Sequence, residues 1–283
     1  MLFLIALSCT SVNKSVSLPL ALRFLRRLPL PRKLGLLERL FGRVLSKHGV
    51  VWVQTANRIR WKLDLADGCH RWLVYGYYEG GAGIKLARRM LKHGGVYVDS
   101  GANIGQWLVY ISNLKQVQTL AFEPVASERS WLTSCIAEQG NWNVEIIANG
   151  LGDEFTSLPI QVHGARSTIQ SDWYAKKGLD RELITMVTLE QALSERSIDR
   201  VRFWKLDVEG FEYEALVGAG KYIEQQKIDG IYFECHPDNF DRNIKLLSSC
   251  GYEIMSFSQG RLGPMSQIST TLSQDYFARP RTT

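Results

Sequence analysis

The sequence lacks several patterns that would assign a compartment or a scaffold at once. Its 283 residues include five cysteines, but there is no CxxC pair, no internal repeat and no low-complexity tract. Such scattered cysteines are typical of a reducing compartment and argue against a disulfide framework or a zinc ribbon. The apolar start, MLFLIAL, is short, has no basic residues before it and is soon followed by Lys14. It fits neither a secretory signal nor a membrane span, so we expect a cytoplasmic protein.

Two phosphate-binding patterns are also missing, namely the GxGxxG turn of dinucleotide-binding folds and the GK(S/T) end of phosphate loops.

Positive charge is concentrated at the N-terminal end of the chain. Residues 1–48 carry nine basic residues and one acidic residue, a balance of +8, whereas residues 49–283 have a balance of −2. A near-neutral body argues against broad contact with a nucleic-acid backbone. We therefore expect no nucleic-acid partner.

The basic N-terminal end is predicted to form a helical arm. Residues 19–48 mix leucines at helical spacing with arginines, and Pro29 and Pro31 divide them into two pieces. One interpretation is an amphipathic appendage packed on the main domain. The alternative is a helix pair that contacts a membrane surface or a partner. We expect residues 1–48 to form this arm and residues 49–283 to form a single domain.

Beyond the arm, strands and helices alternate. Within residues 49–94, RIRWKLDL alternates apolar and polar residues with a period of two and is expected to pair with VVWVQ in a β-hairpin, and a helix is expected over 83–92. Apolar strands then follow at 96–98, 119–122, 144–147, 201–206 and 228–233, separated by helices over 106–115, 126–138 and 212–224. This order predicts a mostly parallel sheet with helices on both faces. YEIMSF and DYFAR are two further strands that would close the sheet as an antiparallel pair.

Residues 152–200 interrupt this order, because they are too long for a simple crossover. They contain two short alternating pieces, LPIQV and ITMV, which predict an inserted hairpin near the mouth of the sheet. Thr188-Leu-Glu-Gln191 has the composition of a capping box and predicts the start of a short helix.

The stretch VYVDSGANIG places a carboxylate, Asp99, at the end of an apolar strand and follows it with Gly101, Asn103 and Gly105. Ligands of open parallel sheets bind outside the carboxyl ends of the strands, and glycines let the backbone approach them closely. An acid at this turn repels a pyrophosphate and attracts a cationic amino group. By itself, however, Asp99 could equally be a turn or cap residue.

The next strand also ends in an acid, Glu123 of LAFEP, which can accept hydrogen bonds from both hydroxyls of a ribose. A ligand with an amino-acid cation at one end and a nucleoside at the other satisfies both acids. We therefore expect S-adenosylmethionine (SAM) as the cofactor.

Two later strands end in titratable groups: Asp207 and Glu209 in FWKLDVEGFE, and Glu234 and His236 in IYFECHP. We expect these strands to lie side by side, next to the strand of Asp99, so that their tips meet beside the cofactor. One carboxylate, Asp207 first, or His236 would accept a proton from a hydroxyl group. Alternatively, the carboxylates would first bind a divalent cation such as Mg²⁺, although no residue is assigned as a metal ligand. Lys205 is expected to face away.

Plainer roles exist for the same residues. Asp207 and Glu209 would suit the N-terminus of the following helix, and His236 could be a hydrogen-bonded structural histidine before Pro237.

Taken in order, the motifs resemble the FkbM-type family of SAM-dependent methyltransferases. They are VDSGANIGQW, AFEP, ANGLGDE, TLEQAL, KLDVEGFEYEALVGA and the ECH of IYFECHP, preceded by GYYEGGAGIKLARRML. The resemblance covers the chain from about Tyr75 to the C-terminus. It implies a class I methyltransferase fold, which is a Rossmann-like α/β fold with a mostly parallel, seven-stranded sheet. It also implies O-methylation of a sugar, glycolipid or polyketide-type hydroxyl.

The resemblance also implies roles for individual residues. Asp99, Gly101, Asn103 and Gly105 would hold the methionine part of SAM and Glu123 its ribose, with the adenine near Asn149, Gly150 and Asp153. Asp207 and Glu209 would face the acceptor, and the insertion would select it. We add Glu79 and Glu234 as substrate-side candidates, although Glu79 would equally suit a helix start. Ser100 departs from the aliphatic residue that is commoner in the family.

Three other functions compete with this one. Nucleic-acid methylation is disfavoured by the absence of a (D/N)PP(Y/F) stretch after Phe203. A catalytically silent SAM-binding module could use the basic arm to dock on a membrane or a partner. A nicotinamide dehydrogenase would bind NAD instead of SAM. The sequence does not predict the oligomeric state.

Overall fold

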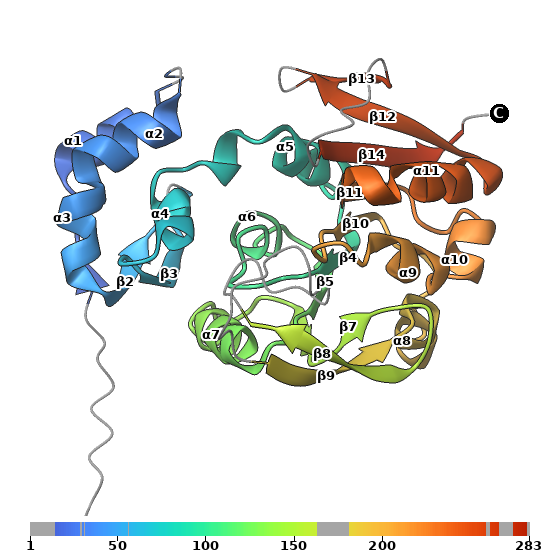
Figure 1. Cartoon of the computed structure of the whole chain (residues 1–283). Helices are drawn as coiled ribbons and strands as arrows, with labels where there is room; N and C mark the ends of the chain where they lie inside the picture. The colour runs from blue at the N-terminus through green and yellow to red at the C-terminus, as the bar shows by residue number, and fades with distance from the viewer. Residues whose placement is uncertain are drawn as a thin grey trace, which may run out of the picture. The chain divides into compact units, whose positions relative to one another are not determined.

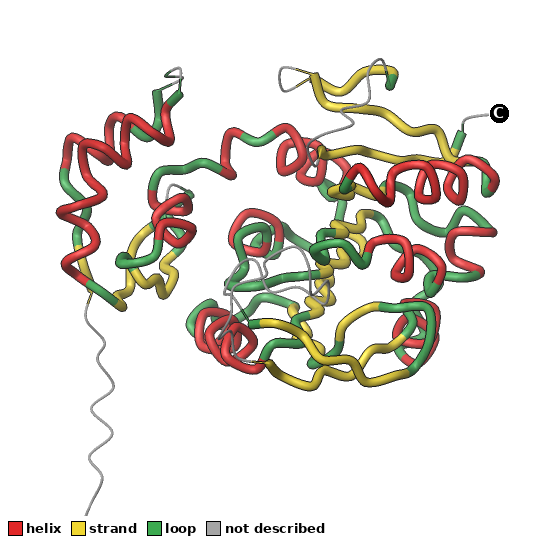
Figure 2. Tube along the Cα trace, viewed as in Figure 1, coloured by secondary structure: helices red, strands yellow, loops and turns green. Residues whose placement is uncertain are grey.

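The computed structural model describes residues 15–28, 30, 32–55, 57–162, 181–258, 261–265 and 274–281. The chain divides into two compact units, Met1–Tyr77 and Tyr78–Thr283. Figures 1 and 2 show their helices and strands. The apolar start of the chain and the middle of the predicted insertion, residues 163–180, lie outside the described residues. In the described ranges, no helix combines the length and the apolar character needed to cross a membrane.

The first unit contains the arm and a small sheet. Its helical segments are α1 (Leu20–Leu25), α2 (Lys33–Leu37), the π-helical turn η1 (Glu38–Gly42), α3 (Arg43–Leu45), η2 (Ser46–His48) and α4 (Gly68–Val74). Its strands are β1 (Ser15–Val16), β2 (Val50–Gln54) and β3 (Arg60–Asp64), in the order β1-β2-β3.

The predicted hairpin is confirmed, since β2 and β3 pair antiparallel with Val53 opposite Trp61. Trp61 and Leu63 alternate with half-exposed polar residues and are buried. The guanidinium of Arg26, at the end of α1, donates to the carbonyl oxygens of Thr55 and Val74 at 3.1 and 3.2 Å. These bonds attach the arm to the hairpin.

The second unit is built on an eight-stranded sheet with the order β13-β12-β14-β11-β10-β4-β5-β6. Its strands are β4 (Gly95–Ser100), β5 (Val117–Phe122), β6 (Val144–Ile147), β10 (Phe203–Leu206), β11 (Ile231–Cys235), β12 (Tyr252–Ser258), β13 (Arg261–Pro264) and β14 (Gln274–Pro280). The five neighbouring strands β6, β5, β4, β10 and β11 pair in parallel. At the other end of the sheet, β14 pairs antiparallel with β11, β12 with β14, and β13 with β12. This is the predicted class I methyltransferase fold. The short edge strand β13 is an addition to the seven strands expected.

The predicted helices of this unit are present in the predicted order with two differences, and α11 (Phe240–Ser249) is a helix that was not predicted. The helical segments of the unit include η3 (Tyr78–Gly80), α5 (Ala82–Met90), α6 (Leu108–Ile111), α7 (Ala126–Ala137), α9 (Glu212–Val217), α10 (Lys221–Glu224), η4 (Pro237–Asn239) and α11. The helix expected over 106–115 is shorter, because positive φ angles at Asn103 and Gly105 delay its start. The helix expected over 212–224 is divided at Gly220, where φ is +45°.

The described part of the insertion forms its own small sheet in the order β7-β9-β8, from β7 (Gly150–Leu151), β8 (Thr156–Gln161) and β9 (Arg181–Val187). β8 and β9 pair antiparallel, as the alternating pieces predicted. The predicted cap is also present: Gln191 N donates to Thr188 Oγ1 at 3.1 Å at the start of α8 (Leu189–Glu195).

The centre of the large sheet explains the unusual residue Ser100. Trp204 of β10 is fully buried, and its indole Nε1 donates to Ser100 Oγ of β4 at 2.7 Å. A buried indole N–H needs an acceptor, which an aliphatic side chain could not supply. The hydroxyl of Ser100 therefore joins the two central strands.

We expect Ser100→Ala to lower the free energy of unfolding by about 1–3 kcal/mol, because it leaves the buried N–H of Trp204 without a partner. Urea denaturation followed by circular dichroism would measure the loss. Ser134→Ala, on the surface of α7, is the matched control and should change the free energy by less than about 0.5 kcal/mol. Equal losses in the two variants would show that the hydroxyl of Ser100 contributes nothing.

Candidate active site

The glycine turn after β4 touches the end of β10. Gly101 has φ +73°, and a Cβ at this position would collide with the carbonyl oxygen of Asp207. Asn103 and Gly105 also have positive φ, at +50° and +88°. Only glycine combines this backbone conformation with so close an approach. The motif that begins with Asp99 is therefore packed directly against the motif that contains Asp207.

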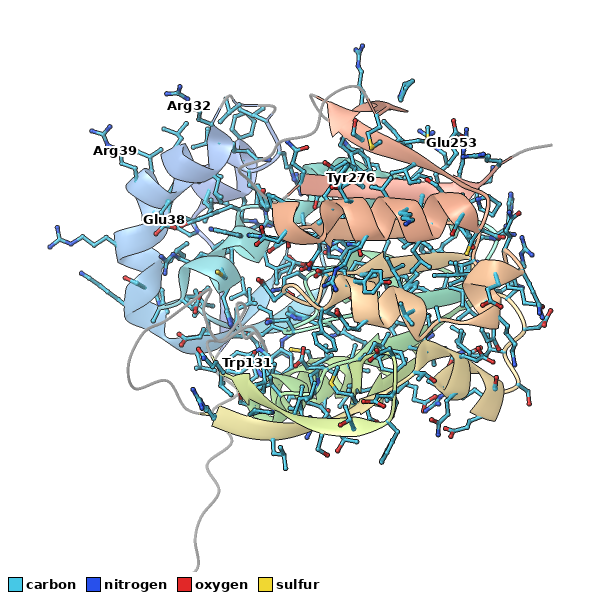
Figure 3. The ribbon with its side chains drawn as sticks, turned by 45° about the vertical axis from the view of Figure 1, so that its right-hand side comes forward. Arg32, Glu38, Arg39, Trp131, Glu253 and Tyr276 are labelled. Carbon is cyan, nitrogen blue, oxygen red and sulfur yellow. The ribbon has the colours of Figure 1, made fainter. Side chains whose placement is uncertain are left out.

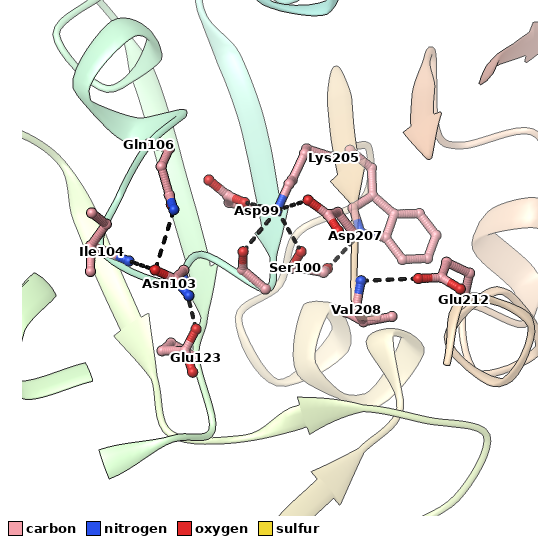
Figure 4. Close-up of polar contacts among 12 residues, drawn as sticks. Asp99, Ser100, Asn103, Ile104, Gln106, Glu123, Lys205, Asp207, Val208 and Glu212 are labelled. Carbon is pink, nitrogen blue, oxygen red and sulfur yellow. Dashed lines mark hydrogen bonds and ion pairs between the residues drawn. The ribbon is translucent and has the colours of Figure 1, made fainter. Parts of the chain in front are cut away.

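A buried lysine connects the two motifs (Figure 4). Lys205 of β10 is opposite Asp99 of β4, and its Nζ lies 3.4 Å from Asp99 Oδ1 and 3.3 Å from Asp207 Oδ2. The same Nζ donates to the carbonyl oxygens of Gly101 and Ser100 at 2.8 and 3.2 Å. Lys205 thus forms ion pairs with two carboxylates and holds the glycine turn.

The prediction that Lys205 faces away from the site is wrong. Residues two apart on a strand point to the same face, so Lys205 accompanies Asp207. Burial alone would lower the pKa of Lys205, but the charges of Asp207 and Asp99 more than offset this and leave its pKa above the ordinary value. The lysine is therefore a fixed cation inside the protein.

Asp99 is itself almost fully buried, with 1% of its surface exposed. Its Oδ2 accepts a hydrogen bond from Tyr97 Oη at 2.9 Å, while Oδ1 has only the ion pair with Lys205. Burial raises the pKa of Asp99, against the opposing effects of Lys205 and Tyr97. Asp99 is thus part of an internally balanced pair and is not the exposed anion that the sequence suggested. Its contact with the methionine part of SAM stays a prediction.

Glu123 supports the glycine turn from β5. Its carboxylate accepts from Asn103 N at 2.7 Å and from Val125 N at 2.9 Å. Burial raises the pKa of Glu123 to about 7, and the two backbone N–H groups act against this rise. A carboxylate has about four acceptor positions, so these two bonds leave capacity for a ribose hydroxyl. Glu123 and the turn therefore fit a nucleoside that bears an amino-acid end.

Two of the three residues assigned to the adenine neighbourhood contact β9. Asn149, two residues after β6 ends, donates from Nδ2 to Thr185 O at 3.3 Å. Gly150 is buried in β7, where a Cβ would lie 2.6 Å from Met186 Sδ. Asp153 is exposed and lines a shallow hollow together with residues of α8 and α9. The role of all three in binding adenine stays a prediction.

The loop that follows Asp207 is held by a residue absent from the predicted site. Glu212 Oε1 accepts from the backbone N–H groups of Val208 and Gly210, both at 3.1 Å. On the other side, Asn239 Nδ2 donates to Gly210 O at 3.0 Å. Glu212 is buried, and this raises its pKa to about 7. These bonds hold Glu209 and Gly210 at positive φ, +51° and +97°.

A second group of carboxyl groups lies where β10, β11 and β14 meet. Leu206 is opposite Phe233, so Asp207 and Glu234 follow side by side, and Glu234 is opposite Asp275 of β14. The pKa of Glu234 is raised to about 9 by burial, by the charge of Asp207 with which it shares a hydrogen bond, and by Glu209 and Asp275. Burial also raises the pKa of Asp275, which is hydrogen-bonded to Tyr232. At neutral pH this group therefore retains a proton on Glu234.

Two other candidates lie apart from this group. His236 follows β11, and its Nδ1 lies 3.3 Å from Asp238 Oδ2. Glu79 is exposed in the turn η3. Their proposed roles as base and substrate contact stay predictions.

Sequence reasoning missed Asp275 and Glu212 as well as the orientation of Lys205. The spacing of Lys205 and Asp207 was a signal that could have been used. The sequence around Asp275 contains no such signal, because the position of Asp275 depends on the register between β14 and β11. Among the described residues, no group of three or more acidic, histidine or cysteine side chains could hold a metal ion. The suggestion of Mg²⁺ gains no support from them.

Comparisons with known proteins agree with this fold. A family profile described as "Methyltransferase FkbM domain" matches residues 99–254. No curated protein matches the chain.

Solved structures are similar only at low sequence identity. An rRNA methylase from Streptococcus thermophilus has a TM-score of 0.43 and 11% identity, covering 70% of this chain and 94% of its own. A SAM-dependent O-methyltransferase from Thermotoga maritima has a TM-score of 0.37 and 14% identity, covering 70% and 64%. The METTL16 MTase domain has a TM-score of 0.47 and 14% identity, covering 95% and 84%. Likeness at this level says nothing about the substrate.

We expect Lys205→Met to lower the free energy of unfolding by about 3–5 kcal/mol, because it leaves Asp99 buried without a cation. Adding Asp99→Asn should restore part of this loss. Lys221→Met is the matched control: its ion pair with Glu190 is partly exposed, and its loss should cost less than about 1 kcal/mol. If the double variant were as unstable as the sum of its single variants, the two side chains would not be coupled.

The raised pKa of Glu234 predicts a pH dependence. Because the pKa of Glu234 is higher in the folded protein than its ordinary value of 4.5, its contribution to stability is present below pH 4.5 and is lost as the pH rises towards about 9. Glu234→Gln does not ionise, so it should be more stable than the wild type at pH 9 by at least about 1 kcal/mol. The difference should shrink towards pH 5. Glu138→Gln, an exposed control, should follow the wild type throughout.

Proposed function

Because the chain belongs to the FkbM methyltransferase family, we propose that it is a SAM-dependent O-methyltransferase. Its acceptor would be a hydroxyl group of a small molecule or glycan, such as a sugar, a glycolipid or a polyketide-type metabolite. The observation that carries this proposal is the pair formed by Asp207 and Glu234 at the neighbouring ends of β10 and β11, in which burial and the charge of Asp207 raise the pKa of Glu234. That pair adjoins the glycine turn, where the cofactor of the family is expected.

The residues at the ends of β4 and β5 would hold the cofactor. The turn from Gly101 to Gly105, with its positive φ angles, would bring its backbone close to the methionine part, and Asp99 and Asn103 are the proposed side-chain contacts there. Glu123 would accept hydrogen bonds from the ribose hydroxyls, and Asn149, Gly150 and Asp153 would lie near the adenine. When bound, SAM supplies a methyl group on a positively charged sulfur, which is already a strong electrophile.

The protein would then have two tasks, positioning the acceptor and taking its proton. Asp207 is the best-placed base, because its side chain is 35% exposed whereas Asp99 and Lys205 are buried. The ammonium of Lys205, 3.3 Å from Asp207 Oδ2, balances its negative charge before the proton arrives. Protonated Glu234 is a hydrogen-bond donor at the same edge and would orient either Asp207 or the acceptor. Much of the rate gain would come from holding the hydroxyl in line with the methyl group.

The loop between β10 and α9 supports this arrangement. Glu212 and Asn239 fix its backbone from two sides, so that Asp207 and Glu209 present their carboxylates in a constant orientation. Glu209 and Glu79 are proposed contacts of the acceptor. His236 is the alternative base.

The test has two measurements on the same proteins. Calorimetric titration with S-adenosylhomocysteine, and with NAD as the comparison, would establish which cofactor binds. Transfer of labelled methyl groups from SAM would then be measured across sugars, glycolipids and polyketide-type alcohols. Asp207→Asn should bind S-adenosylhomocysteine like the wild type but transfer methyl groups at least about 100-fold more slowly. Asp241→Asn, an exposed change on α11, is the matched control.

Each result decides between the functions. An unchanged transfer rate in Asp207→Asn would remove Asp207 from the mechanism while leaving the cofactor assignment intact. Binding of S-adenosylhomocysteine without transfer to any of these acceptors would favour the catalytically silent module. Binding of NAD alone would overturn the methyltransferase.

A further inference from the structure

The helices of the first unit carry large apolar side chains that are exposed. Five such side chains are between 40% and 78% exposed: Leu20, Phe24, Leu36, Leu40 and Val44. They recur every four residues, on α1 and again along the continuous helix made by α2, η1 and α3. Side chains four apart lie on one side of a helix, so each helix carries an apolar stripe.

Exposed arginines run beside both stripes with the same spacing. Arg23 and Arg27 accompany the stripe of α1, and Arg39 and Arg43 accompany that of the second helix. Figure 3 shows Arg32 and Arg39 projecting from this part of the molecule. We call the five apolar residues and these four arginines the arm face.

The acidic residue of the arm is turned away from this face. Glu38 is the single acidic residue among residues 1–48. Its carboxylate accepts from Arg71 Nε at 3.0 Å and from Tyr75 Oη at 2.9 Å. The hydrogen bonds from Arg71 lower the pKa of Glu38, although burial opposes this effect, so the residue stays ionised and paired. The single acidic residue of the arm is therefore already engaged in an ion pair with Arg71.

The π-helical turn η1 makes the inward position of Glu38 possible. A Cβ on Gly42 would collide with the carboxylate of Glu38. Glycine at this position, where the helix is locally widened, leaves room for the glutamate to reach Arg71. The local fold thus pairs the partly exposed Glu38 with Arg71 and leaves the arginines of the arm face exposed.

We propose that the arm face docks on a membrane surface that contains anionic phospholipids. Apolar side chains of a surface helix enter the boundary of the acyl chains, while neighbouring arginines bind the anionic headgroups. Both kinds of group lie on one side of the same helices here, as such a surface requires. A nucleic-acid backbone would use the arginines but would leave the apolar stripes in water. A second copy of the same face would bring arginines against arginines.

The docking inference is independent of the proposed methyl transfer, and its experiment has no enzymatic readout. The full chain is sedimented with vesicles of phosphatidylcholine alone and of phosphatidylcholine mixed with phosphatidylglycerol. We expect binding to the mixed vesicles, little binding to the neutral ones, and progressive release as sodium chloride is added.

Two double variants separate the charged and apolar contributions. Arg39→Gln with Arg43→Gln removes two cations and should weaken binding to the mixed vesicles about 20-fold. Its matched control removes two exposed cations around the end of α5, by Arg89→Gln with Lys92→Gln, and should bind like the wild type. Phe24→Ser with Leu40→Ser keeps the charges and should weaken binding about tenfold. The control for the apolar change is Phe155→Ser, at another exposed apolar residue.

Several outcomes would overturn the proposal. The first is failure of the wild type to bind the mixed vesicles at low salt. The second is equal weakening by the α5 control, which would show attraction to net charge alone. The third is a dimer that Phe24→Ser with Leu40→Ser converts to a monomer in analytical ultracentrifugation, which would assign the face to a second copy. Circular dichroism of each variant would verify that the helices remain folded.

Discussion

The structure of the second unit depends on one buried cation. Lys205 lies between the ends of β4 and β10, forms ion pairs with Asp99 and Asp207, and binds the carbonyl oxygens of the glycine turn. An uncompensated carboxylate at the place of Asp99 would be costly to bury. Lys205 therefore permits Asp99 to be buried in the sheet, and it also places a positive charge beside Asp207.

This cation makes the carboxyl groups of Asp207 and Glu234 differ in their surroundings. Asp207 is close to Lys205, whereas burial and the neighbouring carboxylates hold a proton on Glu234. Two adjacent carboxyl groups that share a single proton are a common way to obtain a base and a hydrogen-bond donor at one pH. The loop that carries Asp207 is fixed by Glu212 and Asn239, so the pair is rigid before any ligand arrives.

The arm shows the same separation of charges in another setting. Glu38 is drawn inward by Arg71 and Tyr75, in a helix that Gly42 widens. The exposed residues of the arm face are all basic or apolar. In both units, then, an ion pair engages some of the charges and leaves others for contact with other molecules.

Much of the fold was determined by the sequence alone, because it depends on local patterns. Alternating and continuous apolar runs located β3, β4, β5, β6 and the hairpin of the insertion, and the Thr188 cap appeared where its composition predicted it. Tertiary structure decided the rest, because interactions between distant residues control it. The inward direction of Lys205, the pairing of Glu234 with Asp275 and the ion pair of Glu38 with Arg71 each require knowing which segments become neighbours. The sequence gives the sign of the charge on each side chain, but folding decides which partner the side chain has and how exposed it is.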